Sequence, residues 1–142
     1  MGGLKTKKDI PDSDHVLRYC KPSNIVDGKI SPGAFAIRPG EQSLSVNWLE
    51  FFGKETPITH QIEKIRQAMS AKLALKRSGR FARINAGSAR EKIAELAIKH
   101  LPTPKNRSHA GIFYPGGDNE ETALELANLV KPENVFPVNH QK

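Results

Sequence analysis

The segment Leu44-Ser45-Val46-Asn47-Trp48-Leu49 decides the fold class of this chain. Its apolar residues alternate with Ser45 and Asn47, and successive side chains of a β-strand point to opposite faces of the sheet. We therefore predict that 44–49 is a strand with one face on the core and that Trp48 anchors this core.

The clearest helix of the sequence follows this strand. Thr56-Pro57 is typical of a helix start, because Thr can cap the free backbone N–H groups and Pro lacks an N–H that the first turn leaves unpaired. Gly79 is suited to a helix end. We predict a helix over 57–78 that packs across the sheet, with its apolar stripe facing the strand that contains Trp48. Its apolar stripe consists of Ile58, Ile62, Ile65 and Met69.

Shorter elements are predicted on both sides of this pair. Capping patterns at Ser88 and Asp118 predict helices over 89–95 and from Asp118 to about 130. Residues 96–101 fit a helix or a strand, and both stay open. Alternating, β-branched or aromatic residues predict strands over 15–20, 34–38, 80–86 and 110–114.

Together these elements predict a mixed α/β (α+β) fold. We expect one small mixed sheet of about four to five strands, with two to three helices. A length of 142 residues suits a single domain. Residues 1–14 are small and charged and are predicted to be a disordered tail, whereas 15–142 form one globular domain with an extended C-terminal tail.

Cys20 is the only cysteine of the chain. A single cysteine excludes a disulfide framework and a zinc site made mainly of thiolates, and Cys20 is interpreted as a core residue. No stretch approaches the 18 consecutive apolar residues that indicate a membrane helix. We expect a soluble, cytoplasmic protein with no membrane association, and no cofactor or metal site is predicted.

Positive charge is concentrated in the middle of the chain. The formal net charge is +7, but residues 61–107 contain 12 basic and 3 acidic residues, a net charge of +9. Such an excess attracts polyanions, of which nucleic acid is the commonest, although a solvated helix face is the alternative. The predicted nucleic-acid-binding residues are Lys64, Lys72, Lys76, Arg77, Arg80 and Lys105.

His109 is the main candidate for catalysis. It follows the basic loop Lys105-Asn106-Arg107 at the start of a predicted strand, and such junctions often carry functional groups. An imidazole there could act as a general acid or base on a phosphodiester, with Arg107 stabilising the anion. Ser108 could orient the imidazole, and His15 or His100 could supply a second polar group. The alternative is a half-buried histidine bonded to backbone.

Three segments carry a resemblance to known proteins. HVLRYC (15–20), LSVNWLE (44–50) and SHAGI (108–112) together resemble a family of small uncharacterised bacterial proteins, which implies a bacterial or phage-related origin and no particular activity. The chain also resembles ADP-ribosyltransferase-type toxins. These carry a His or Arg on a first strand and a Ser on a later one, here Arg18 and Ser45. Their catalytic Glu lies on a further strand, whereas Glu121 and Glu125 lie on a predicted helix.

Three classes of function follow. The leading hypothesis is a nucleic-acid-associated protein, such as an accessory of a mobile-element or phage-defence system. The second is a small enzyme that acts on a nucleotide or RNA phosphodiester, or an ADP-ribosyltransferase-like toxin. The third is an interaction module that docks on an acidic protein partner. The sequence leaves both an enzyme and a binding protein open.

Overall fold

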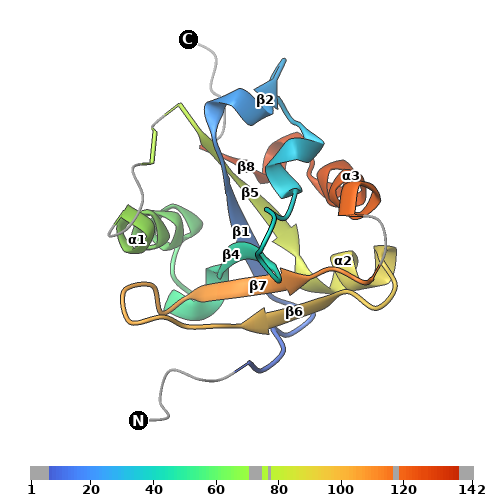
Figure 1. Cartoon of the computed structure of the whole chain (residues 1–142). Coiled ribbons are helices and arrows are strands. Elements are labelled where there is room, and N and C mark those ends of the chain that lie inside the picture. The colour runs from blue at the N-terminus through green and yellow to red at the C-terminus, as the bar shows by residue number, and fades with distance from the viewer. Residues whose placement is uncertain (1–6, 71–74, 77, 117–118, 138–142) are drawn as a thin grey trace.

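The computed structural model describes residues 7–70, 75–76, 78–116 and 119–137. Its main element is a six-stranded sheet in the order β6-β7-β4-β1-β5-β8 (Figure 1). All strand pairs among the described residues are antiparallel. The sheet strands are β1 (His15–Cys20), β4 (Leu44–Trp48), β5 (Arg80–Asn85), β6 (Ala97–His100), β7 (His109–Phe113) and β8 (Val135–Phe136).

The α+β class is confirmed, but the sheet differs from the prediction. It has six strands rather than four to five, and its pairing is antiparallel rather than mixed. A separate hairpin joins β2 (Ile25–Val26) to β3 (Lys29–Ile30). The extra sheet strands are β6, within the segment for which helix and strand stayed open, and β8, within the predicted extended C-terminal tail.

Helices cover both faces of the sheet (Figure 1). On one face lies α1 (Ile58–Ser70), and on the other lie α2 (Ala86–Lys92) and α3 (Asn119–Leu129). The prediction of two to three helices is confirmed. Four short 3-10 turns complete the described chain: η1 (Pro22–Asn24), η2 (Pro32–Phe35), η3 (Leu49–Phe52) and η4 (Pro132–Asn134).

The two faces bury separate cores. The larger one joins the sheet to η2, α2 and α3, and it includes the fully buried Phe35, Ile98 and Leu126. The smaller core lies under α1. Its buried members are Leu17, Leu49, Ile62, Ile65 and Phe81.

The prediction that the helix packs across the sheet that contains β4 is confirmed, but α1 does not cover the face on which Trp48 lies. Trp48 pairs with Val16 and packs against the larger core, whereas α1 packs on Leu17, the next residue of β1. Successive residues of a strand face opposite sides, so α1 and Trp48 lie on opposite faces of the sheet. The helix is also shorter than predicted, since residues 75 and 76 are not helical and 71–74 lie outside the described residues.

Two further segments depart from their predicted structure. Residues 34–38 do not form a strand, because Pro32 starts the 3-10 turn η2, which buries Ala34 and Phe35. The helix predicted over 89–95 begins earlier, at Ala86, because the side chain of Asn85 caps it by accepting the Ser88 N–H at 2.8 Å.

The segment 7–14 belongs to the folded domain. The Lys7 and Ile10 N–H groups donate to carbonyls of β6 at 2.8 and 3.0 Å, and the side chains of Ile10 and Asp14 are buried. Disorder over 1–14 is therefore wrong for residues 7–14, while 1–6 lie outside the described residues. Within the described ranges, no helix has the length and apolar character needed to cross a membrane.

Candidate functional site

A cavity opens where β1 and β4 separate. The two strands share only the pairs Val16–Trp48 and Leu17–Asn47, although β1 goes on to pair with β5 along all six of its residues. The gap beyond Leu17 leads into a cavity of about 710 Å³ on the α1 face of the sheet. Small-molecule sites typically measure about 300–1,000 Å³.

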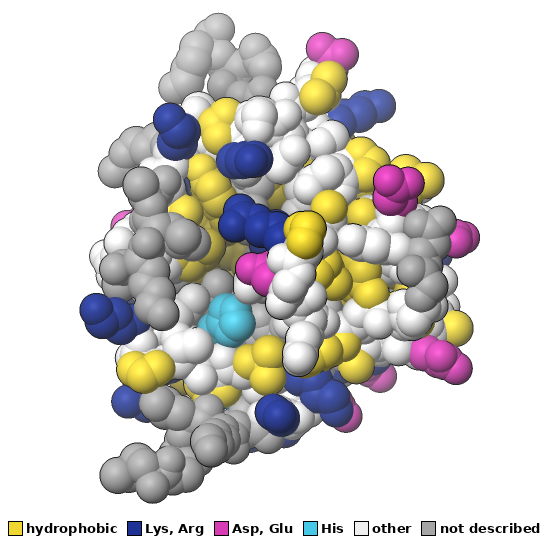
Figure 2. Space-filling view, in the orientation of Figure 1, with side chains coloured by type: hydrophobic (Ala, Val, Ile, Leu, Met, Phe, Trp, Pro, Cys, Tyr) yellow, Lys and Arg dark blue, Asp and Glu magenta, His cyan; other side chains and the backbone are white. Residues whose placement is uncertain are grey.

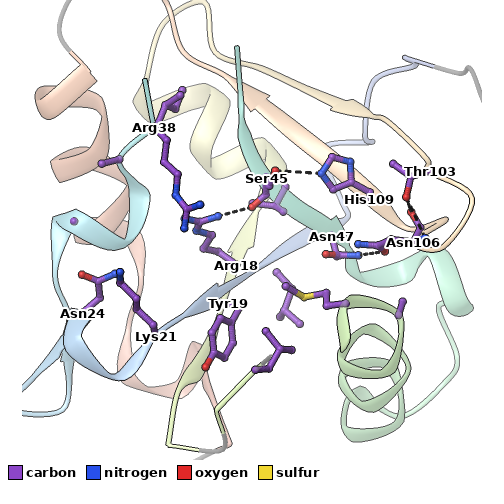
Figure 3. A pocket seen from close by; sticks show the side chains of 18 of the residues that line it. Arg18, Tyr19, Lys21, Asn24, Arg38, Ser45, Asn47, Thr103, Asn106 and His109 are labelled. Carbon is purple, nitrogen blue, oxygen red and sulfur yellow. Dashed lines mark hydrogen bonds between the residues drawn. The ribbon is translucent and has the colours of Figure 1, made fainter. Parts of the chain in front are cut away.

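The cavity has a polar wall and an apolar wall. Ser45 and Asn47 of β4, His109 of β7, and Thr103 and Asn106 of the β6–β7 loop form the polar wall (Figure 3). The pairing register explains part of this arrangement, because Leu17, Asn47 and His109 lie in one row across β1, β4 and β7. The facing apolar side chains include Ala68, Met69 and Leu75, at the end of α1 and just after it.

Arg18 fills the gap between the separated strands. Its Nε donates to the Ala34 carbonyl and its Nη1 to the Ser45 carbonyl, both at 2.8 Å. No described carboxylate forms an ion pair with it. Burial lowers the pKa of this guanidinium, and repulsion by Arg38 lowers it further, yet an arginine keeps its charge in proteins. Arg18 thus carries a half-buried positive charge that bonds to two carbonyls, and the Glu41 carboxylate attracts this charge without forming an ion pair with it.

The cavity is positively charged as a whole. Arg18, Lys21, Arg38 and Lys76 line it, and none of its described lining residues is acidic. Arg38 extends into the same part of the cavity as Arg18 (Figure 3). On the surface, Lys and Arg side chains gather in the middle of this face, and an acidic side chain lies between them and a His side chain (Figure 2). This charge favours an anionic ligand.

His109 and Ser45 form a hydrogen-bonded pair in the polar wall. The Nδ1 of His109 lies 2.8 Å from the Leu101 carbonyl oxygen, and its Nε2 lies 3.2 Å from Ser45 Oγ (Figure 3). A carbonyl oxygen only accepts, so Nδ1 carries a proton. In the neutral ring Nε2 is then the acceptor, and the Ser45 hydroxyl donates to it.

Asn47 fastens the β6–β7 loop to the sheet. Its buried amide donates to Asn106 Oδ1 and to Ser108 Oγ, both at 2.6 Å. Ser108 is therefore part of this buried network and not the group that orients His109. The Nδ2 group of Asn106 has no hydrogen-bond partner among the described residues, and Asn106 lines the cavity.

The other predicted catalytic residues lie outside the cavity lining. Arg107 is exposed, and its backbone carbonyl contacts His100 Nε2 at 2.8 Å. The ring of His100 is buried against Trp48. His15 Nδ1 contacts Glu50 Oε2 at 2.5 Å. Of the three residues proposed for catalysis, only His109 lies in the cavity wall. The cavity is lined by Arg18 and not by Arg107.

The predicted nucleic-acid-binding residues are spread over several elements. Lys76 lines the cavity. Lys64 is exposed on α1, Arg80 donates to the Ser78 and Gly79 carbonyls, and Lys105 is exposed in the β6–β7 loop. Lys72 and Arg77 lie outside the described residues.

Sequence reasoning did not identify Asn47, Asn106 or the basic pair Arg18 and Arg38 as site residues. One available signal was that Ser45 and Asn47 share a strand face without any charged side chain, which is unusual for a solvated face. Arg18 and Ser45 were paired only through the toxin resemblance, and they do lie together. Glu121 and Glu125 lie on α3 and are not part of the cavity lining.

Comparisons with known proteins give no match. A scan against protein-family models found none, and searches of curated proteins and of solved structures also found none. Among the described residues, no group of three or more His, Cys, Asp or Glu side chains is placed to hold a metal ion.

Cys20 offers a test of the core beside the site. It is fully buried, and burial raises the pKa of its thiol from 9.0 to about 12. The folded protein is expected to resist a thiol-specific reagent such as DTNB at pH 8, and the unfolded protein to react with one equivalent.

The raised pKa of the Cys20 thiol also predicts that the free energy of unfolding falls at high pH. The unfolded thiol ionises from about pH 9, while the folded thiol stays protonated up to about 12. Stability from Cys20 is therefore lost as the pH rises through this window. Over this range the wild type should lose more free energy of unfolding than Cys20→Ala, and equal losses would contradict the expectation.

Proposed function

We propose that the cavity binds the phosphate of a nucleotide unit, in a nucleic-acid strand or as a free nucleotide. The observation that carries this proposal is the half-buried charge of Arg18, which bonds to two carbonyls and pairs with no described carboxylate. A phosphate oxygen would form the direct ion pair that Glu41, which attracts Arg18 from a distance, does not form, and an arginine can hold a phosphate with two parallel hydrogen bonds. Arg38 adds a second guanidinium to the same part of the cavity.

The cavity walls support a ligand larger than inorganic phosphate. The apolar side chains of Met69 and Leu75 offer a surface for a base, and the amides of Asn47 and Asn106 line the same cavity. A phosphate at Arg18 with a base or sugar beside it would use both walls. This combination of an apolar surface and a few convergent polar groups is typical of ligand sites.

A nucleic-acid strand would also use charges outside the cavity. Lys64 and Lys105 are exposed, and residues 61–107 carry a net charge of +9. We therefore keep nucleic-acid association in the cytoplasm as the leading function, and a role in a mobile element or phage defence stays a prediction. An interaction module should show an apolar patch, but the large exposed apolar residues of the described chain, Val26, Phe51 and Leu124, lie on three separate elements.

The test is a binding titration with two probes. A labelled single-stranded RNA is followed by fluorescence anisotropy and AMP by calorimetry, each at low and at physiological salt. Arg38→Met should weaken binding of the preferred probe by roughly tenfold or more, because a hydrogen bond to a charged group contributes about 1.5–3 kcal/mol. Arg38 is exposed and its side chain bonds to no described residue, so its replacement is expected to leave the fold intact.

Lys29→Met is the matched control. It removes the same charge from an exposed residue of β3 that lies outside the segment 61–107 and does not line the cavity. Equal weakening by both variants would show a diffuse electrostatic attraction in place of a site, and no binding of either probe would overturn the proposal. The affinity for the single-stranded RNA should fall steeply as the salt concentration rises, whereas the affinity for AMP should fall only slightly.

A further inference from the structure

The His109 ring is held in the tautomer that a general base needs. The Leu101 carbonyl fixes the proton on Nδ1, and Nε2 therefore presents its lone pair to the Ser45 hydroxyl at 3.2 Å. In serine hydrolases a carboxylate fixes the same tautomer. Here a backbone carbonyl does so, and the strand β7 that carries His109 is paired on both sides, with β4 and β6.

Ser45 is open to the cavity on its other side. It is exposed, it lines the cavity, and His109 is the only described partner of its Oγ. Its backbone cannot swing away, because β4 pairs with β7 at this residue and the Ser45 carbonyl accepts from Arg18. The hydroxyl thus points into a cationic cavity with a base behind it, which is the arrangement of an activated nucleophile.

From this geometry we infer that Ser45 is a nucleophile activated by His109 and that the cavity hydrolyses a phosphodiester through a phosphoserine intermediate. This inference rests on the proposed phosphate site and adds a reaction to it. Arg18 bonds to the carbonyl of Ser45 itself, so a phosphate held by Arg18 lies beside Ser45 Oγ. The guanidinium can then stabilise the negative charge on the phosphoryl oxygens as the bonds change.

The reaction balances in two steps. First, Ser45 Oγ attacks phosphorus and its proton moves to His109 Nε2. The Oγ–P bond forms, the P–O bond to the leaving group breaks, and Nε2 returns the proton to the departing oxygen. Second, water attacks the phosphoserine, Nε2 takes its proton, and the P–Oγ bond breaks as the proton returns to Ser45. The net reaction consumes one water and one phosphodiester, and it needs no oxidant or further reactant.

Diisopropyl fluorophosphate tests the nucleophile separately from the phosphate site. The reagent is uncharged, so it does not depend on the basic residues. Attack by Ser45 forms the Oγ–P bond and expels fluoride. Intact-mass and peptide analysis of the wild type should find one adduct, located on Ser45. Ser45→Ala should lose it, and His109→Gln should slow its formation by about 100-fold or more, the usual contribution of a general base.

His60→Gln is the matched control, because His60 is exposed on α1 and does not line the cavity. It should label at the wild-type rate. Labelling with the uncharged reagent needs no bound nucleotide. The two proposals therefore fail separately. If the wild type is labelled but binds no nucleotide, the proposed phosphate site is rejected. If the wild type forms no adduct, or if His109→Gln forms it at the wild-type rate, the inference that Ser45 is a nucleophile activated by His109 is overturned.

Turnover is measured with bis(p-nitrophenyl) phosphate. The wild type should release p-nitrophenol, and Ser45→Ala should reduce the rate to background. Hydrolysis that survives in Ser45→Ala would overturn the covalent mechanism, because it would show that water is activated without Ser45. Circular dichroism of each variant verifies that the fold is retained.

Discussion

Replacing Phe81 by alanine is expected to lower the free energy of unfolding by about 3–5 kcal/mol. Phe81 lies on β5 and is fully buried in the smaller core under α1. Its ring meets the edge of Tyr19 at a centroid distance of 5.4 Å, and the guanidinium of Arg66 lies 5.0 Å from its centroid. No neighbouring side chain can fill the space without leaving its own contacts, so the variant would retain a cavity. Urea denaturation followed by tryptophan fluorescence measures the loss.

Phe51→Ala is the control for this prediction. Its side chain is 37% exposed and contacts the rings of Trp48, Phe52 and His100. Truncation should cost no more than about 1.5 kcal/mol, because the ring stays partly in water and an aromatic pair contributes about 0.5–1.5 kcal/mol. Similar losses for both variants would show that the face of the sheet under α1 is not a closed core.

Ile10→Ala is expected to lower the free energy of unfolding by about 2–5 kcal/mol. A loss of this size is expected because the side chain of Ile10 has 0% solvent exposure and belongs to the larger core. Its backbone N–H also donates to the Ile98 carbonyl at 3.0 Å, which fixes the segment beside β6. Thermal or urea denaturation of the variant gives the measurement.

Val26→Ala provides the comparison. Val26 is a β-branched residue of the hairpin with 57% exposure, so its truncation should change stability by about 0.5 kcal/mol or less. If Ile10→Ala changed stability equally little, residues 7–14 would behave as the detached tail that their composition predicts, and the packing seen along β6 would be refuted.

The spacing of apolar residues was sufficient to predict those strands and helices whose buried side chains recur with the period of the element. Strand β5 and the apolar side of β4 follow from alternation, because Leu44 and Val46 of β4 and Ala82 and Ile84 of β5 are buried on one face. Helix α1 follows from its stripe, with Ile62 and Ile65 buried against the sheet. The position of α1 could not be predicted in the same way, since a strand pattern does not say which face a helix covers.

Several elements depend on partners distant in the sequence. Residues 97–100 are compatible with helix or strand, and pairing with β7 decides for the strand. The polar, charged segment 7–14 has little apolar surface of its own, but Ile10 finds a closed core formed by residues far along the chain. β8 has only two residues and exists because β5 offers an open edge.

The sequence by itself determined the α+β class, the alternation of β4 and the concentration of positive charge, because each depends on residues close together in the chain. The tertiary structure alone decided the cavity. Separation of β1 from β4 is a matter of strand pairing, and it leaves the Ser45 carbonyl for Arg18 to satisfy. It also decided the partner of His109, since Ser45 lies 64 positions away and only the β4–β7 register brings the two side chains together. Coulombic and hydrogen-bonding interactions act over a few ångströms of space, and distance along the chain does not measure them.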